Sequence, residues 1–325
     1  MRKYKAAFVS ADPANSSVNY VYSAEQQKEI AAITDLIPGI AGPEDIAAGK
    51  LAGTEVIFST WGMIEFTPEQ LKKMPELKAV FYGAGATDYF ARPLFANGIH
   101  VYSSWLANAI PVAEFCVAQI LLGLKGYFRA SRELKSPEKF NHSLAGAGVY
   151  GATVALIGAG AISGKVQELL KNFKVNVIVV PSRKENRTVS LEEAFTKALV
   201  VSNHLPDRDD NVGVLDGKLF RAMPEGAVFI NTGRGRQVNG AEMIEVLESR
   251  PDLTALLDVT YPEPPEAGSK LYNMSNVILS PHIAGSLNDE VHRMADYMIE
   301  EYKRYASGED CLYEVVESML LTSRG

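Results

Sequence analysis

A short apolar run that ends in a glycine-rich turn places the strongest constraint on the fold. Residues 153–157 (Thr-Val-Ala-Leu-Ile) lead directly into Gly158-Ala159-Gly160, and a helical pattern covers 165–173. In such a unit the first glycine allows a tight turn, and the second lets the backbone approach a pyrophosphate. Backbone N–H groups at the start of the helix then face the anion. The pattern predicts a dinucleotide site whose contacts include Gly158, Gly160, Ala161 and Ile162.

Short apolar runs alternate with helical patterns on both sides of a long helical pattern that runs from Ile110 to about Lys125. Apolar runs without polar alternation are typical of strands that are covered on both faces of a parallel sheet. A length of 325 residues favours two domains. The strands predicted for the first series are 6–9, 56–59, 79–82 and 100–102, and those for the second are 153–157, 175–180, 199–202, 227–231, 253–257 and 277–279.

These patterns predict an α/β fold with two Rossmann-like domains, each built on a doubly wound parallel sheet. Residues 106–294 form the predicted dinucleotide-binding domain, which is inserted between residues 1–105 and 295–325. A final helix, predicted from Glu290 to about Tyr305, leads the chain back to the first domain.

The residues that follow the second strand of the dinucleotide unit indicate which coenzyme is preferred. The chain there reads Pro181-Ser182-Arg183-Lys184, without an acid. An acid at this place would accept hydrogen bonds from the ribose hydroxyls of NAD and repel a 2′-phosphate. A hydroxyl followed by two cations favours NADP over NAD. The alternative is that Arg183 and Lys184 only form a solvated loop.

Composition narrows the class of protein. Apolar residues make up 47% and charged residues 22%, as in ordinary globular proteins, and a net charge of −7 gives no reason to expect nucleic acid as a partner. The two cysteines, Cys116 and Cys311, support neither a disulfide framework nor a metal site. The apolar stretch 110–124 is interrupted by Glu114 and Gln119, so we expect no membrane span and a cytoplasmic protein.

An arginine, a glutamate and a histidine stand in short frames downstream of the glycine turn. Arg234 lies in Asn-Thr-Gly-Arg-Gly (231–235), Glu263 in 258–264, and His282 in Ser-Pro-His-Ile-Ala-Gly (280–285). Such a set can bind a carboxylate and donate a proton. Taken singly, Arg234 can be a surface residue after a turn, Glu263 a loop residue between prolines, and a lone histidine is usually structural.

Together these frames resemble the D-isomer-specific 2-hydroxyacid dehydrogenases, which include glyoxylate/hydroxypyruvate reductases. The resemblance covers nearly the whole chain and is strongest from 153 to 285. The matching segments are 226–235, 257–264 and 280–285, together with 112–114 and 204–206.

The resemblance implies an enzyme that moves a hydride between nicotinamide and C2 of a 2-oxo or 2-hydroxy acid. It implies that Arg234 binds the substrate carboxylate, that His282 is the acid and base, and that Glu263 holds the imidazole and favours its charged form. Asp258 is expected to contact the nicotinamide carboxamide. Further cofactor contacts expected are Ser182, Arg183, Lys184, His204, Pro206, Asn211, Thr232, Gly233, His282 and Gly285, and further substrate contacts are Gly83, Ala84 and Gly85.

Three positions depart from the family's pattern. Ser163 replaces the third glycine, Ala161 stands where an arginine is frequent, and Asn211 stands where a threonine is usual. By the resemblance, the positions of Ala161 and Asn211 normally help to hold the pyrophosphate, so we expect the cofactor to be bound more weakly or in a different arrangement. The resemblance further implies a homodimer, a flavodoxin-like substrate domain and domain closure. Two alternatives remain open: a non-enzymatic, corepressor-like scaffold that senses dinucleotides, and a phosphite-type dehydrogenase on the same fold.

Overall fold

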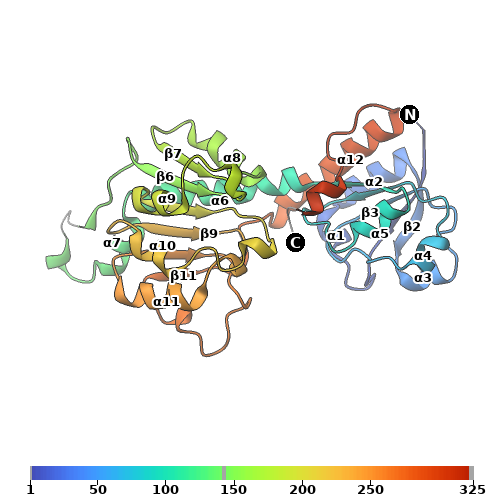
Figure 1. Ribbon diagram of the computed structural model, residues 1–325. Helices are drawn as coiled ribbons and strands as arrows, with labels where there is room; N and C mark the ends of the chain where they lie inside the picture. The colour runs from blue at the N-terminus through green and yellow to red at the C-terminus, as the bar shows by residue number, and fades with distance from the viewer. Residues whose placement is uncertain (1, 141–143, 322–325) are drawn as a thin grey trace. The chain divides into compact units, whose positions relative to one another are not determined.

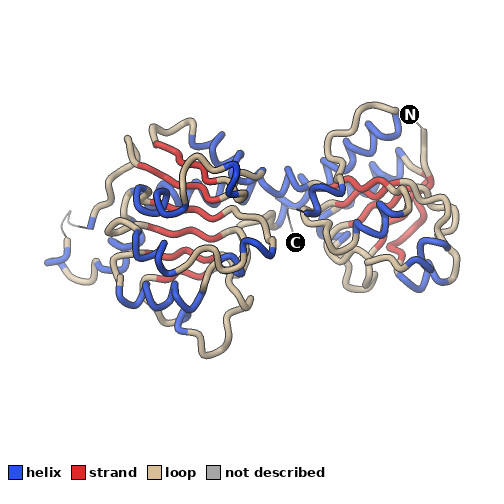
Figure 2. The backbone as a smooth tube through the Cα atoms, in the orientation of Figure 1, coloured by secondary structure: helices blue, strands red, loops and turns tan. Residues whose placement is uncertain are grey.

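The computed structural model describes residues 2–140 and 144–321. Its chain separates into two compact units: unit 1 comprises Met1–Asn108 and Ser286–Gly325, and unit 2 comprises Ala109–Gly285. The inserted segment therefore runs from 109 to 285, where the sequence suggested 106 to 294. Within each unit the strands lie side by side and helices flank the sheet (Figures 1 and 2). The predicted fold class, two α/β domains with parallel sheets, is confirmed.

The described part of unit 1 forms a five-stranded parallel sheet in the order β2-β1-β3-β4-β5. Alternate residues of β1 enter two different cores: Ala7 and Val9 pack with α3–α5, whereas Ala6 and Phe8 pack with α1, α2 and α12. The strands are β1 (Lys5–Val9), β2 (Asp35–Ala41), β3 (Val56–Ser59), β4 (Ala79–Tyr82) and β5 (His100–Ser103). The helices are α1 (Val18–Val21), α2 (Ala24–Ile33), α3 (Pro43–Ala47), α4 (Pro68–Lys72), α5 (Ala91–Ala96) and α12 (Val291–Ser307).

Two elements of unit 1 at the edges of its sheet differ from the prediction. Strand β2 was not predicted, because Pro38 and Gly39 interrupt its apolar run; Gly39 has a φ of 84°. The register against β1 shifts between Ala6 and Phe8, as expected where an edge strand accommodates a proline. At the opposite edge, Glu314 forms an antiparallel bridge with Tyr102, so the C-terminal segment covers β5.

The described part of unit 2 forms a six-stranded parallel sheet in the order β11-β10-β9-β8-β6-β7. The chain passes from β6 to β7 on one side and then returns to β8 on the other side of β6. This reversal creates a switch point between β6 and β8, where ligands of such sheets usually bind. The strands are β6 (Thr153–Ile157), β7 (Asn176–Val180), β8 (Val200–Asn203), β9 (Val228–Asn231), β10 (Thr254–Leu257) and β11 (Val277–Leu279).

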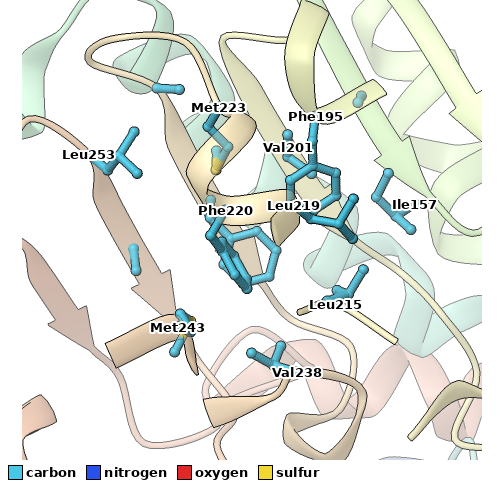
Figure 3. Packing of buried hydrophobic residues seen from close by; sticks show 14 of the residues in the cluster. Ile157, Phe195, Val201, Leu215, Leu219, Phe220, Met223, Val238, Met243 and Leu253 are labelled. Atoms are coloured by element: carbon cyan, nitrogen blue, oxygen red, sulfur yellow. The ribbon is translucent and has the colours of Figure 1, made fainter. Parts of the chain in front are cut away.

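Helices cover both faces of this sheet. Side chains of α9–α11 pack with Ala155 and Ile157 on one face, where Phe195 and Phe220 lie among aliphatic side chains (Figure 3). Side chains of α6 and α8 pack with Val154 and Leu156 on the other. The helices are α6 (Trp105–Leu124), α7 (Tyr127–Glu133), α8 (Ala161–Leu170), α9 (Leu191–Lys197), α10 (Gly217–Ala222) and α11 (Gly240–Ser249).

Helices α6 and α8 begin earlier than predicted. α6 starts at Trp105 and contains Pro111, which the sequence suggested was close to a helix start. α8 starts at Ala161, directly after the glycine turn, and not at Lys165. Among the described residues, α6 is the one helix that is long and apolar enough to cross a bilayer. Its residues Val112, Ala113, Cys116, Ile120 and Leu124 are buried in the core of unit 2, as in the central helix of a globular domain.

A buried carboxylate ties the C-terminal segment to α12, and its loss is expected to destabilise unit 1. Glu301 is fully buried and accepts hydrogen bonds from the backbone N–H groups of Leu312 (2.7 Å) and Tyr313 (2.6 Å). Glu301→Ala leaves both donors without their acceptor and should lower the free energy of unfolding by about 2–4 kcal/mol. Urea unfolding followed by tryptophan fluorescence measures this, since Trp61 and Trp105 both lie in unit 1.

The matched control is Glu300→Ala, which removes an exposed carboxylate paired with Lys303. We expect it to change the free energy of unfolding by less than about 0.5 kcal/mol. Equal stabilities for the two variants would show that the buried carboxylate does not hold the C-terminal segment.

Candidate active site

The glycine turn after β6 is shaped by a close backbone contact at the switch point. Gly158 has a φ of 115°, and a Cβ on it would lie 2.3 Å from the carbonyl oxygen of His204, which follows β8. No residue other than glycine fits there. Gly160 is the N-cap of α8, and a Cβ on it would meet no heavy atom within 4 Å. In the part of the chain that the structure describes, no side chain caps this helix. The open turn and the uncapped N–H groups fit a pyrophosphate.

Two of the three departures from the family pattern are accommodated by local hydrogen bonds. Ser163 is fully buried, and its hydroxyl oxygen accepts from Gln167 Nε2 at 3.5 Å, while the same Nε2 donates to the Ser163 carbonyl oxygen at 3.2 Å. Asn211 is buried as well and donates from Nδ2 to the carbonyl oxygen of Pro206 at 2.9 Å. Asn211 therefore closes the loop after β8. Its predicted contact with the cofactor stays a prediction.

His204 is a buried imidazole at the same switch point. The residue is only 8% exposed, and neither ring nitrogen has a hydrogen-bond partner among the described residues. Burial lowers the pKa of His204 to about 4, so the ring is neutral near pH 7.

The segment after β9, which carries Arg234, rests on buried amides that the sequence did not single out. Asn203 Nδ2 donates to Asn231 Oδ1 (2.9 Å) and to Gln237 Oε1 (2.6 Å). Gln237 Oε1 also accepts from the N–H of Arg234 (3.2 Å), and Asn231 Oδ1 from the N–H of Gly233 (3.2 Å). These side-chain hydrogen bonds fix the backbone of Gly233 and Arg234. The sequence signal for this cluster is an asparagine at the end of each of two apolar strands, Asn203 and Asn231.

A second close backbone contact joins this segment to the loop that carries Glu263. A Cβ on Gly235 would lie 2.0 Å from the carbonyl carbon and oxygen of Thr260. The Arg234 side chain is half-buried, and Nη1 donates to the carbonyl oxygen of Gly233 at 2.9 Å. The remaining N–H groups of its guanidinium have no protein acceptor within the described ranges, so they can bind a carboxylate.

The structure brings Glu263 and His282 into direct contact. His282 Nδ1 lies 2.7 Å from Glu263 Oε1, and both side chains are partly exposed. His282 has a φ of 55°, a left-handed conformation that is unfavourable for a residue with a side chain. Residues held in such conformations are frequent at functional sites, where surrounding contacts enforce them.

Asp258 supplies those contacts. Its buried carboxylate accepts hydrogen bonds from Ser280 Oγ (2.6 Å), Ile283 N (2.9 Å) and Ala284 N (3.0 Å). The carbonyl oxygen of Asp258 accepts from the N–H of His282 at 3.0 Å. Asp258 therefore shapes the turn that presents the imidazole, and its predicted contact with the carboxamide stays a prediction.

Arg234, Glu263 and His282 follow three neighbouring strands. They come after β9, β10 and β11 respectively, and these strands are parallel and adjacent. Because carboxyl ends of parallel strands meet at one edge, the three residues and the glycine turn share the same edge of the sheet.

Thr232 and Cys116 pack together beneath this edge. The Cys116 sulfur lies 3.2 Å from Thr232 Oγ1, and burial raises the pKa of the thiol to about 11. Such a thiol is unreactive at neutral pH. Within residues 2–140 and 144–321 no group of three or more His, Cys, Asp or Glu side chains is placed to hold a metal ion.

The loop Gly83-Ala84-Gly85 of unit 1 has its carbonyl groups fixed by hydroxyls. Thr60 Oγ1 donates to the Gly83 carbonyl (2.7 Å), and Ser103 Oγ lies 2.7 and 2.8 Å from those of Ala84 and Gly85. In a trans peptide the N–H points away from the preceding C=O. The N–H groups of Gly85 and Ala86 therefore point away from Ser103, an arrangement that suits an anion.

At the end of β7, two of the three residues predicted to prefer NADP are exposed, and the third has an unpredicted partner. Arg183 and Lys184 are exposed, whereas Ser182 Oγ accepts a hydrogen bond from Arg208 Nη1 at 3.2 Å. Arg208 also pairs with Asp210. The sequence has no acid directly after β7, but the fold brings an acid close to this place from the loop after β8.

Comparisons with known proteins show the family to which the chain belongs. Residues 117–284 match the family described as "D-isomer specific 2-hydroxyacid dehydrogenase, NAD binding domain". The putative 2-hydroxyacid dehydrogenase YoaD of Bacillus subtilis is 31% identical over 202 residues, 58% of this chain and 59% of YoaD. The glycerate dehydrogenase of Methylorubrum extorquens is 24% identical over 82% of this chain and 87% of its own length.

Among solved structures, a phosphoglycerate oxidoreductase from Rhizobium etli has a TM-score of 0.79 and 21% identity over 97% of this chain and 99% of its own. This likeness shows the shared fold. The family match covers more than half of the chain, and the chain therefore belongs to the D-isomer specific 2-hydroxyacid dehydrogenases.

Because Gly235 lies against the backbone of Thr260, a single added methyl group is expected to destabilise unit 2. Gly235→Ala would place Cβ against backbone atoms, which cannot move aside as a flexible side chain can. We expect a loss of about 2–4 kcal/mol in the stability of unit 2, measured by hydrogen exchange of strands β9 and β10. Gly240→Ala is the control, because its Cβ meets no heavy atom within 4 Å at the first position of α11. Equal exchange in both variants would contradict the prediction.

The buried imidazole predicts a pH dependence with a definite sign. The pKa of His204 is about 4 in the folded chain, below the value of about 6.5 usual in unfolded chains. The unfolded state therefore binds the proton more readily between these values. The stabilising contribution is complete above pH 6.5 and is lost, up to about 3 kcal/mol, as the pH falls to 4.

Proton NMR of the five histidines tests this directly. We expect the resonance that disappears in His204→Gln to keep its neutral-ring shift down to pH 5.5. A titration midpoint above pH 6 for this resonance would show that the ring reaches water or a hydrogen-bond acceptor.

Proposed function

We propose that this protein is an NAD(P)-dependent oxidoreductase that interconverts a 2-oxo acid and the corresponding 2-hydroxy acid. The proposal combines membership of the dehydrogenase family with the geometry at the carboxyl edge of unit 2. The observation that carries it is the contact between His282 Nδ1 and Glu263 Oε1 at 2.7 Å. A carboxylate on one ring nitrogen leaves the other, Nε2, to exchange a proton with a substrate oxygen.

The proton chemistry follows from this pair. In the direction of reduction His282 carries protons on both nitrogens, and Glu263 stabilises the charge. The nicotinamide coenzyme, when bound, supplies the hydride that reaches C2. Nε2 of His282 gives its proton to the carbonyl oxygen as the C–H bond forms, which leaves a neutral imidazole and a 2-hydroxy acid. In oxidation the same ring accepts the hydroxyl proton.

Arg234 is proposed to bind the substrate carboxylate and polarise the adjacent carbonyl. Its backbone N–H is held by Gln237 Oε1, and its guanidinium keeps N–H groups for a ligand. Two parallel N–H donors match the two oxygens of a carboxylate. A fixed backbone orients the fork relative to the pair formed by Glu263 and His282, as a positioned acid requires.

The preferred coenzyme is proposed to be NADP. Ser182, Arg183 and Lys184 offer a hydroxyl and two cations where β7 ends, and these groups favour a 2′-phosphate. A homodimer and carboxylate binding by Gly83–Gly85 remain predictions from the resemblance, and a cytoplasmic location remains a prediction from the sequence pattern.

Turnover assays test the function. Oxidation of NADPH and of NADH is followed by absorbance with glyoxylate, hydroxypyruvate, phenylpyruvate and 2-keto sugar acids. We expect turnover with at least one acid and a preference for NADPH. His282→Ala should lower kcat by about 10²–10⁴-fold, because the proton donor is lost, while dinucleotide binding is retained.

His100→Gln is the control, since His100 begins β5 and pairs with Glu314 at the edge of unit 1 opposite the strand carboxyl ends. It should leave kcat within twofold. Tight binding of dinucleotide without turnover of any acid would favour the scaffold that senses dinucleotides. Unchanged turnover in His282→Ala would exclude the proposed acid.

A further inference from the structure

The loop after β8 sends an arginine to the end of β7. Arg208 Nη1 donates to Ser182 Oγ at 3.2 Å, over a separation of 26 positions in the chain. The other side of the guanidinium holds Asp210, with Nε donating to Oδ1 at 2.7 Å and Nη2 donating to Oδ2. One guanidinium thus joins the hydroxyl at the end of β7 to a carboxylate from the next loop.

Burial distinguishes the two partners of this ion pair. The Arg208 side chain is only 10% exposed, whereas that of Asp210 is 64% exposed. Arg187 fixes the adjoining turn, because Nε donates to the Pro181 carbonyl and Nη2 to that of Ser182, each at 2.8 Å. The guanidinium of Arg208 is therefore a built-in part of the site, and Asp210 is the partner that water can replace.

The position of Asp210 matches that of an anion. Its pKa lies below the ordinary value, because Arg208 donates hydrogen bonds to the carboxylate and because the charge of Arg183 adds to the attraction. Asp210 is therefore stabilised by two guanidinium groups close to the Ser182 hydroxyl. The end of the second strand of a βαβ unit is the place where the adenosine ribose of a dinucleotide lies.

The same set of donors suits a phosphate monoester better than it suits a carboxylate. A phosphate offers three acceptor oxygens and nearly two negative charges, and an arginine fork binds it through two parallel hydrogen bonds. The Asp210 side chain is 64% exposed, so water can solvate its carboxylate once a ligand displaces it from Arg208. This solvation lowers the cost of exchanging the carboxylate for a phosphate.

We propose that Arg208 is a ligand of the 2′-phosphate of NADP and that Asp210 forms an ion pair with Arg208 until the phosphate displaces it. This inference rests on the proposed preference for NADP and adds two residues that determine it. Asp210 competes with the phosphate, so it limits the affinity for NADP without affecting the part of the site that holds the pyrophosphate.

Binding of 2′,5′-ADP and 5′-AMP to the full chain tests the proposal, because the two probes differ only in the 2′-phosphate. Isothermal titration calorimetry should show that the unmodified chain binds 2′,5′-ADP at least about tenfold more tightly. Arg208→Met should reduce this difference severalfold, although Arg183 and Lys184 remain, and should leave 5′-AMP affinity within twofold. Asp210→Asn should raise the affinity for 2′,5′-ADP severalfold. Arg221→Met, an exposed arginine of α10, is the matched control and should change neither affinity.

Each other result overturns the proposal. Unchanged 2′,5′-ADP affinity in Arg208→Met removes Arg208 from the site. Weaker 5′-AMP binding in Asp210→Asn, without a gain for 2′,5′-ADP, would make Asp210 an acceptor for the ribose hydroxyls and NAD the coenzyme. Equal affinities of the unmodified chain for both probes would refute both the phosphate site and the preference for NADP.

Turnover of 2-oxo acids separates this inference from the proposed function. If the unmodified chain reduces a 2-oxo acid with NADPH and Arg208→Met still binds 2′,5′-ADP normally, the proposed function holds but Arg208 is not a ligand of the phosphate. A chain whose affinities shift as expected without reducing any acid has the phosphate site and another function. Normal binding of 5′-AMP to each variant shows that unit 2 remains folded.

Discussion

Two backbone contacts that leave no room for a side chain determine the carboxyl edge of unit 2. Gly158 lies against His204, and Gly235 lies against Thr260. The first contact joins the loops after β6 and β8, and the second joins those after β9 and β10. Because these loops meet through their backbones, the geometry of the glycine turn and of Arg234 does not depend on flexible side chains. A rigid edge of this kind is what positioned chemistry requires.

Buried polar side chains then place the residues that can act on a ligand. Asp258 binds the turn of His282, and Asn203 with Gln237 supports the backbone of Arg234. Each support comes from a neighbouring strand or loop, and its hydrogen-bonding groups are largely satisfied by protein atoms. Satisfied buried networks hold one arrangement, because any alternative would leave a polar group without a partner. The left-handed conformation of His282 persists for this reason.

Most of the fold could be predicted because its sheets are buried on both faces. Continuous apolar runs such as 153–157 and 79–82 can hardly be anything other than internal strands. The prediction was wrong where local signals conflict with tertiary packing. Strand β2 at the sheet edge was not predicted because it contains Pro38 and Gly39, and the first turn of α6 was not predicted because Pro111 suggested a later helix start. Ala161–Gly164 lacks helix-start signals, although α8 begins there after the glycine turn.

The sequence by itself determined the class of fold and the glycine turn, and it predicted Arg234, Glu263 and His282 as site residues, because these inferences depend on local patterns. Only the tertiary structure decided which residues form hydrogen bonds that support these segments. Asn203 reaches Gln237 over 34 positions, and Arg208 reaches Ser182 over 26. Such pairs arise from the order of parallel strands, which places the ends of distant segments at one edge. The physical reason is that hydrogen bonding requires side-chain direction and distance, and neither is encoded in spacing along the chain.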